Sequence, residues 1–439
     1  MPLRYLIHVL IFLIGCQTKF SSDNQLEILA KIGDRLITRQ DYLNRTEYTL
    51  RPDYCRGNQY LHKKVILNNL IAEKLLAIEA ESVNNQINSD NLNAFLKGRK
   101  EQAMRQLLYF EKGHNKVLLE EDEINHYFKM AGRTYHVNYF SFPGGAFADS
   151  VKRAIDEGMS FNDIYAVNFE GNIPDRDVNW IDNNDLFISD RLFNNEIQKG
   201  QVIGPYFLDD GSAFIMKVNG WTDRMDLSEL GNIDRREKVI NTLKERKGKL
   251  IYKSFIKNIM KGKNIKLNED IFFPYANAIR DQFFRSREEK ETAISNALFE
   301  AGEFLSLEDI RPMNKKYQDL IILSVNEENW TVKDFEIKLA SHPLVFRKKK
   351  MDKSEFSHQF KLAIVDFIQD HYLTKKAYEL GLDKTDTIHL NESLWADSFT
   401  AYQSAKLLMS TQSDSVEQHI LMKPIIDNLQ KKYSPQISI

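Results

Sequence analysis

The chain has 439 residues, of which 28% are charged, yet its formal net charge is only −2. A nucleic-acid-binding surface needs an excess of basic residues, so this balance argues against nucleic acid as a partner. The length predicts several domains, and a hydrophobic content of 42% is enough to give each of them a core.

The chain opens with an apolar segment that ends in a cysteine. Residues 1–15 have Arg4 near the start and then a short apolar run, which is typical of a secretory signal peptide. The run is too short to span a bilayer, which takes about 20 apolar residues. LIGC (13–16) resembles the bacterial lipobox, in which cleavage precedes the cysteine and its thiol is lipidated. We therefore expect an exported protein anchored through Cys16; an ordinary signal peptide with a chance cysteine is the alternative.

The residues after the cysteine bear on where the anchor is held. The polar stretch 16–26 reads as a tether, and Gln17 stands where Asp would otherwise favour retention in the inner membrane. In a host with two membranes, this favours the periplasmic face of the outer membrane. Only one further cysteine, Cys55, occurs, so no intramolecular disulfide framework is expected.

An N-terminal helical domain is predicted over residues 27–132. LEILAKIGDRLITRQDY (26–42) has the pattern of a strand, a turn, a second strand and a helix start. Thr38 and Asp41 have the spacing of a capping box at that start. Three amphipathic helices follow over 62–81, 90–113 and 118–132.

The residue pattern changes at residue 133 from amphipathic helices to aromatic and β-branched segments, which predicts a small α+β domain that extends to 223. TYHVNYFSF (134–142) is aromatic and β-branched, as in a strand. Two short helices separated by a break at Gly158 follow, then a turn-rich segment at 178–187. The stretch 193–221 ends in two strands joined by a turn at Asp209-Asp210-Gly211. The predicted fold class of the whole chain is α+β.

The last third repeats the first. A helical connection is expected over 224–300, a C-terminal helical module over 301–412 and a polar, loosely ordered tail over 413–439. Within the module, QDLIILSVNEENWTVKDF (318–335) has the same strand, turn, strand and helix-start pattern as 26–42. Thr331 with Asp334 matches Thr38 with Asp41. The helix at 362–382 likewise matches 62–81. We interpret this as an internal duplication, although amphipathic helices resemble one another by nature.

These segments together resemble the SurA-like bacterial foldases, in which helical chaperone modules accompany a parvulin-type peptidyl-prolyl isomerase domain. The resemblance rests on AKIGDRLITRQDY, LNNLIAEKLLAIEAE, EGMSFNDIYAVNFEG and IQKGQVIGPYFLDDGSAFIMKV, in that order along the chain. It implies helical modules that flank a parvulin-like domain at 133–223, and it implies no cofactor.

The polar centre of a parvulin site is missing from this sequence. The family resemblance implies two histidines on adjacent strands, and these positions map to Tyr139 and Phe214; the usual Cys, Asp or Ser maps near Asn168. His136 precedes Tyr139 by an odd number of residues, which places it on the opposite face of the strand. We therefore interpret His136 as a surface residue and the domain as degenerate.

What remains at the expected site is apolar. The candidate residues of a peptide-binding groove are Tyr139, Trp180, Leu186, Phe193, Phe207, Phe214 and Met216. Leu186 and Phe193 are expected to belong to the domain core rather than to a groove. No histidine, cysteine or carboxylate cluster has metal-ligand spacing, and no phosphate-binding loop occurs.

The expected function is that of a lipid-anchored envelope chaperone which binds unfolded, newly exported polypeptides and whose isomerase activity is weak or lost. One alternative is an active isomerase in which the Tyr139 hydroxyl and backbone groups replace the histidines. The other is a structural lipoprotein that uses the domain for docking, because a fold does not by itself imply a function.

Overall fold

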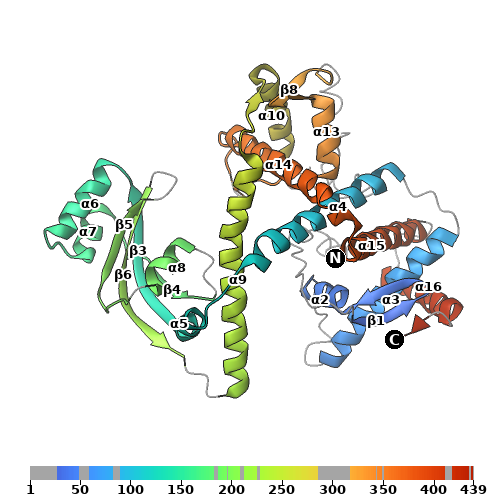
Figure 1. The fold of residues 1–439 in the computed structure, drawn as a ribbon, viewed down its shortest axis with the longest axis horizontal. Coiled ribbons are helices and arrows are strands. Elements are labelled where there is room, and N and C mark those ends of the chain that lie inside the picture. The colour runs from blue at the N-terminus through green and yellow to red at the C-terminus, as the bar shows by residue number, and fades with distance from the viewer. Residues whose placement is uncertain are drawn as a thin grey trace. The chain divides into compact units, whose positions relative to one another are not determined.

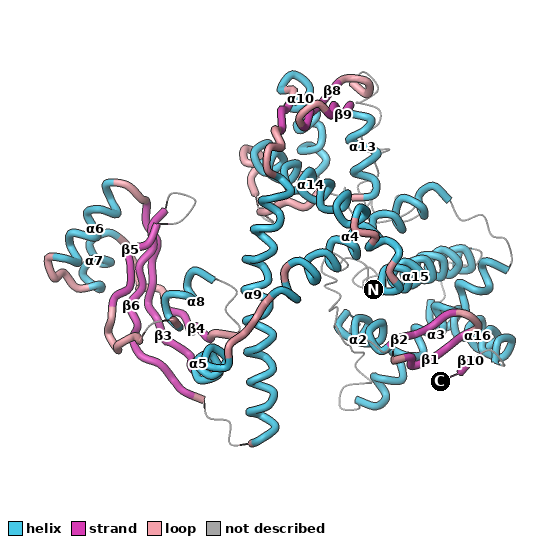
Figure 2. The backbone as a smooth tube through the Cα atoms, in the orientation of Figure 1, coloured by secondary structure: helices cyan, strands magenta, loops and turns pink. Residues whose placement is uncertain are grey.

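The computed structural model describes residues 27–48, 59–82, 89–181, 186–194, 196–207, 212–224, 228–284, 317–342, 344–348, 351–410, 418–434 and 437–438. The chain forms two compact units, residues 112–252 and residues 1–111 with 253–439 (Figure 1). Helices and small sheets occur in both, which is compatible with the predicted α+β class (Figure 2). The signal peptide, the tether, Cys16 and Cys55 lie outside the described residues and stay predictions.

The unit of residues 112–252 is built on one four-stranded antiparallel sheet, and the predicted domain 133–223 lies within it. The sheet has the strand order β4-β3-β6-β5. Its strands are β3 (Arg133–Pro143), β4 (Asp175–Asn179), β5 (Val202–Phe207) and β6 (Ser212–Asp223). Its helices are α5 (Glu121–Ala131), α6 (Ala146–Asp156), α7 (Phe161–Asn168), α8 (Leu186–Phe193) and the part of α9 (Glu229–Met260) up to residue 252.

Strand alternation divides this sheet into two packed faces. On β3, Tyr135 and Val137 face a core that includes residues of α5, α8 and α9, whereas Phe140 and Phe142 face a second core with α6 and α7. Successive side chains of a strand point to opposite faces, so one strand serves both layers. Figure 1 shows α6 and α7 on one side of the sheet and α5 and α8 on the other.

The other unit contains the predicted duplication. The first copy comprises β1 (Ile28–Ile32), β2 (Arg35–Thr38), α2 (Arg39–Tyr48), α3 (Gln59–Ser82) and α4 (Ser89–Lys112). The second comprises β8 (Ile321–Val325), β9 (Glu328–Thr331), α13 (Val332–Ser341), α14 (Phe356–Glu379) and α15 (Asp386–Ser410). The corresponding long helices α3 and α14 each have 24 residues.

The local chemistry of the two copies is the same at the hairpin-to-helix junction. The Thr38 hydroxyl accepts a hydrogen bond from the Asp41 backbone N–H, and the Asp41 carboxylate accepts one from the Thr38 backbone N–H. Thr331 and Asp334 form the same reciprocal pair. Each capping box satisfies backbone donors that a helix leaves unpaired at its start, as the sequence predicted.

Each hairpin is completed by a third strand from another part of the chain. The two sheets have the orders β10-β1-β2 and β7-β8-β9, in which β10 is Ile437–Ser438 and β7 is Ile265–Leu267. Strand β7 interrupts the expected helical connection 224–300, and α10 (Glu269–Phe283) follows it. Each added strand lies on the free edge of the first strand of its hairpin.

The core of the first copy is completed by residues far along the chain. Helix α15 packs along α3, and α16 (Gln418–Tyr433) packs on α3 as well. Leu429 and Tyr433 of α16 and Ala401 of α15 are buried in one core with Leu70 and Leu75. The predicted loose order of the tail is therefore wrong for 418–434. The signal was present in the sequence: apolar residues recur at helical spacing and form the face of α16 that packs on this core, namely Met422, Ile425, Ile426, Leu429 and Tyr433.

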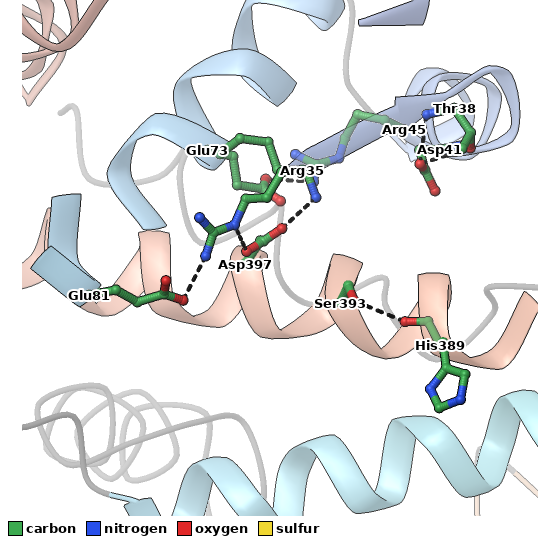
Figure 3. A network of polar contacts seen from close by, with 10 residues as sticks. Arg35, Thr38, Asp41, Arg45, Glu73, Glu81, His389, Ser393 and Asp397 are labelled. Atoms are coloured by element: carbon green, nitrogen blue, oxygen red, sulfur yellow. Dashed lines mark hydrogen bonds and ion pairs between the residues drawn. The ribbon is translucent and has the colours of Figure 1, made fainter. Parts of the chain in front are cut away.

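A buried ion-pair network joins α15 to the first copy (Figure 3). The Lys74 ammonium lies 2.7 Å from one Asp397 oxygen, and the Arg35 guanidinium lies 2.6 Å from the other. Arg35 also contacts Glu81 at 2.6 Å. The Lys74 and Asp397 side chains are only 3% and 6% exposed, so each charge depends on its partner for compensation.

Candidate functional site

The candidate site is the sheet face of residues 112–252 that carries both positions expected to hold histidines. In the register of β3 and β6, Tyr139 lies opposite Met216, and Ser141 lies opposite Phe214. Across β5 and β6, Tyr206 lies opposite Phe214. Tyr139, Tyr206, Phe214 and Met216 all belong to the core on the α8 side. The structure therefore brings Tyr139 and Phe214 to one face, as the resemblance implied.

Helix α8 borders this face and adds a cation to it. The Arg191 guanidinium lies 4.8 Å from the centre of the Tyr206 ring, and the Tyr206 and Phe214 ring centres are 6.3 Å apart. Ile188, one turn earlier on α8, packs against the same core. We call Tyr139, Ile188, Arg191, Tyr206 and Phe214 the aromatic corner. All but Phe214 are half-buried, so the corner is accessible at its edge.

Helix α8 is held in place by contacts from α5. His126 Nε2 lies 3.0 Å from the Phe193 carbonyl oxygen, and the Tyr127 hydroxyl donates to the Asn194 side-chain oxygen at 2.5 Å. Both contacts are at the C-terminal end of α8. Since Arg191 and Ile188 lie on this short helix, these contacts also set their position over the sheet.

Three of the groove candidates are core residues in the structure. Trp180 is 1% exposed, Phe193 0% and Met216 1%. A fully buried side chain cannot contact a peptide without local opening, so we no longer include these three in the groove. Phe193 conforms to the expectation that it is a core residue. The Leu186 side chain lies outside the described residues.

Trp180 shows why an aromatic residue in a turn-rich segment need not line a groove. Its ring stacks on Tyr127 at 4.7 Å between centres, and the Arg246 guanidinium lies 4.5 Å from its centre. Arg246 also donates to the Trp180 carbonyl at 2.7 Å. Burial raises the pKa of Tyr127 and lowers that of Arg246. The cluster joins α5 and α9 to the sheet and is structural.

The remaining candidates lie on the opposite face. Phe207 is 60% exposed, but it lies opposite Ala213, which belongs to the core under α6 and α7. Asn168 ends α7, where its side chain donates to the Ile164 carbonyl at 2.7 Å. Asn168 therefore caps its own helix on that face and does not join Tyr139 in the aromatic corner.

His136 is on the face opposite Tyr139, as its odd spacing predicted. Its Nδ1 lies 2.6 Å from an Asp177 carboxylate oxygen, and its Nε2 lies 2.6 Å from the Thr222 hydroxyl. The three side chains come from three neighbouring strands, and those of His136 and Asp177 are 42% and 69% exposed. They form a solvent-exposed cross-strand cluster rather than a displaced catalytic histidine.

Arg191 and Tyr206 were not found from the sequence. Tyr206 precedes Phe207, and only the strand register shows which of the two faces the candidate site. Arg191 could not be recognised as a site residue, because a basic residue in the last turn of a helix is commonly explained by its favourable interaction with the helix dipole. Strand β4 was missed as well: its first three residues, Asp175 to Asp177, are charged and exposed, as befits a sheet edge.

The chemistry open to the aromatic corner is limited by its polar atoms. These are the hydroxyls of Tyr139 and Tyr206 and the guanidinium of Arg191. A phenol and a phenyl ring occupy the positions where the family resemblance implies imidazoles. The corner therefore offers aromatic contact area and hydrogen-bond donors, and it lacks the expected proton-exchanging pair.

Within the parts of the chain that the structure describes, no group of three or more His, Cys, Asp or Glu side chains is placed to hold a metal ion. Among the described helices, none combines the length and the hydropathy needed to cross a bilayer.

Comparisons with known proteins give a distant likeness among solved structures. No protein-family model matches the sequence, and no curated protein does. The chain is similar to the crystal structure of PrsA from Bacillus subtilis, with 15% identity and a TM-score of 0.17, over 56% of this chain and 97% of that one. So low a TM-score does not establish a common fold. The function proposed below therefore rests on the residues of the chain itself.

Proposed function

We propose that this protein is a lipid-anchored envelope chaperone of the parvulin-foldase type, which binds unfolded exported polypeptides and has weak or no isomerase activity. The observation that carries the proposal is the aromatic corner. One face of the sheet carries both Tyr139 and Phe214, the two positions at which the resemblance implies histidines.

Catalysis of prolyl isomerisation makes demands that the corner meets only in part. The uncatalysed barrier of about 18–20 kcal/mol arises from amide resonance, so a catalyst must stabilise a twisted amide whose nitrogen has become basic. Aromatic side chains can hold a proline ring or another apolar side chain, and they lose little conformational entropy on binding. Binding without efficient turnover is what these residues support.

Half-buried aromatic residues suit a broad range of clients. Tyr139 and Tyr206 each present an apolar ring and a hydroxyl, and Arg191 can pair with a carboxylate or stack on a ring. Such a surface favours extended segments that carry aromatic residues. The helical copies of the other unit would add further binding surface of the same client class.

The anchor and the location form a separate part of the proposal. They rest on the apolar run before Cys16 and on the lipobox resemblance of LIGC. Dual acylation gives stable attachment, whereas a single chain holds a protein only reversibly. A Cys16→Ser variant should move from the membrane fraction to the soluble fraction, and metabolic labelling with a palmitate analogue should mark only the parent chain.

The test of the binding proposal uses the protein from residue 18 onward. NMR exchange spectroscopy on a proline-containing aromatic peptide measures binding and cis/trans interconversion in one sample. We expect line broadening without accelerated exchange. Tyr139→Ala should weaken peptide binding by about 1–2 kcal/mol, roughly the effect of truncating an aromatic contact residue. Phe207→Ala is the matched control, because Phe207 is exposed on the opposite face of the same sheet.

The alternatives predict different outcomes. Accelerated exchange that is lost in Tyr139→Phe, with affinity retained, would identify a working isomerase that uses the hydroxyl. Failure to suppress the aggregation of several unrelated unfolded proteins, together with co-purification of one fixed partner, would identify a structural lipoprotein and refute the chaperone proposal.

A further inference from the structure

The end of helix α9 and the segment that follows it carry an uninterrupted run of positive charge. The whole chain has 60 basic and 62 acidic residues, which nearly balance. Residues 246–268, in contrast, contain eight lysines or arginines and no aspartate or glutamate. Any carboxylate that compensates this charge must therefore come from outside the segment.

Three lysines of this run form a row on one side of the helix. Lys253 and Lys257 lie on α9, and Lys261 lies in the turn directly after it, so the three follow one another at intervals of four residues. Residues four apart are neighbours on a helix surface. Lys253 and Lys257 are about 6 Å apart along the axis, which is less than the Debye length of about 8 Å at physiological ionic strength, so their potentials add. We call Lys253, Lys257 and Lys261 the basic row.

The basic row is presented to solvent on a helix that is fixed by its other side. Ile259 and Met260 pack against the core that includes Phe272. All three lysines of the row are exposed, and none forms an ion pair with a residue that the structure describes. The row is therefore held in place without being neutralised.

Other basic groups of the same run have partners. The Lys249 ammonium lies 2.7 Å from a Glu245 carboxylate oxygen, one turn before it on α9. The Lys263 ammonium lies 4.4 Å from the centre of the Tyr372 ring, which is a cation–π distance. These two lysines are thus engaged within the chain, and they do not belong to the row.

A second basic run in the sequence is also compensated. Arg347 contacts the Asp366 carboxylate at 2.6 Å, and Lys348 contacts Glu355 at 2.5 Å. A cluster of basic residues in the sequence is therefore not enough to indicate a cationic surface. The basic row differs from this run because its charges lack carboxylate partners in the described part of the chain.

The helix dipole explains only part of the basic row. Lys257 lies in the last turn of α9, where a cation is favoured. The effect falls off within that turn, so it does not account for Lys253. Like charges four residues apart also destabilise a helix. The row is therefore unfavourable in isolation, and an anionic partner would relieve its repulsion.

The side chains around the basic row indicate the chemistry of that partner. The exposed side chains between residues 253 and 262 are all polar: Lys253, Ser254, Lys257, Asn258 and Lys261. A polypeptide-binding surface relies on apolar or aromatic anchors, which this side of the helix does not offer. Lysine is a hydrated point charge that does not require the bidentate geometry of arginine. A layer of anionic lipid headgroups attracts such segments without insertion of apolar side chains.

We propose that the basic row is an electrostatic contact site for an anionic phospholipid surface. This inference rests on the proposed lipid anchor, which would hold the chain at such a surface, but the contact itself can be measured without the anchor. The anchor would supply attachment, and the row would set which side of the helical unit faces the membrane.

The first test is co-sedimentation of the protein from residue 18 onward with phosphatidylcholine vesicles that contain about one-third phosphatidylglycerol, or none. We expect binding to the anionic vesicles only, and its loss when salt is raised from about 0.05 to 0.5 M. Each lysine near an anionic surface contributes about fivefold to binding. The triple variant Lys253→Gln, Lys257→Gln, Lys261→Gln should therefore bind about a hundredfold more weakly.

A matched variant removes three exposed lysines that are far apart in the sequence: Lys116→Gln, Lys152→Gln and Lys333→Gln. It has the same net charge as the row variant and should bind the anionic vesicles almost as tightly as the parent. Both variants should unfold at the temperature of the parent, because every replaced side chain is exposed. Equal loss of binding in the two variants would show an effect of net charge alone and would overturn the site. Equal binding of the parent to neutral and anionic vesicles would overturn it as well.

Two other anions are tested in the same assay. Binding of a polyglutamate peptide that the row variant abolishes, without any binding to anionic vesicles, would identify acidic polypeptides as the partner and overturn the lipid site. Displacement from the vesicles by inorganic phosphate, but not by chloride at the same ionic strength, would assign the row to free phosphate. Absence of vesicle binding would leave the anchor untouched, whereas vesicle binding without acyl labelling of Cys16 would refute the anchor alone.

Discussion

Replacing Asp397 should be the most damaging single change in the network that joins α15 to the first helical copy. Asp397→Leu removes the carboxylate that contacts both Lys74 and Arg35, and it leaves the Lys74 ammonium in a site that is 3% exposed. Removing one partner of a buried ion pair costs about 3–5 kcal/mol, because the other charge is left uncompensated. We expect a loss in this range.

The reverse change should cost less. Lys74→Met keeps the length and the apolar stem of the side chain, and Asp397 retains its 2.6 Å contact with Arg35. We expect a loss of about 1–2 kcal/mol, near the value of a hydrogen bond to a charged group. The double variant should be more stable than Asp397→Leu alone, because no lysine charge is then left buried.

The assay is amide hydrogen exchange of peptides from α15, which reports the free energy of local opening. Global unfolding is less informative, because a chain of two compact units need not unfold in one step. Lys376→Met is the matched control, since Lys376 pairs with Glu379 on an exposed surface and should contribute less than about 0.5 kcal/mol. Additive losses in the double variant would refute the coupling.

Three further predictions follow from single positions. Gly248→Ala should destabilise residues 112–252 by about 1–3 kcal/mol in thermal unfolding, because an added Cβ would lie 2.9 Å from the His114 Cα. This clash should outweigh the higher helix propensity of alanine. A stabilised variant would contradict the close approach. Burial, and secondarily Lys338, lowers the pKa of His371 to about 4, so the unfolded chain binds the proton first. Stability should therefore fall by about 1–2 kcal/mol, discounted for partial exposure, as pH decreases from about 6.5 to 4, and His371→Gln should flatten this dependence in urea titrations at several pH values. Thr331→Ala should cost about 1 kcal/mol through loss of its capping bond, with Thr331→Ser close to the parent; an equal loss in both would show that the hydroxyl is not responsible.

The elements that the sequence predicts best are those with local causes. Thr38 with Asp41 and Thr331 with Asp334 are separated by three residues, and both capping boxes form as the spacing indicated. The same holds for the alternation of β3 that separates Tyr139 from His136. In each case, the residues whose contacts or orientation determine the local structure are only three positions apart along the chain.

The elements that it predicts poorly depend on partners far along the chain. Helix α16 has an apolar face, but where that face docks is decided by the core of α3 and β1, which lies more than 300 residues earlier in the chain. In the candidate site, Trp180 and Met216 were predicted to line the groove but are buried, because the sequence of a strand or turn does not show which helices cover each of its side chains. Arg191 reaches Tyr206 only once α8 lies over the sheet.

The docking of α15 and α16 on the first copy has a consequence for the order of events during synthesis. Arg35 and Asp397 are 362 residues apart, so the first hairpin is made long before its ion-pair partner. At about 5–20 residues per second, the interval is roughly 20–70 s. Throughout that time, the apolar side of α3 that α15 and α16 later cover lacks its final partners. The N-terminal module therefore completes its core only after the last helices have been synthesised.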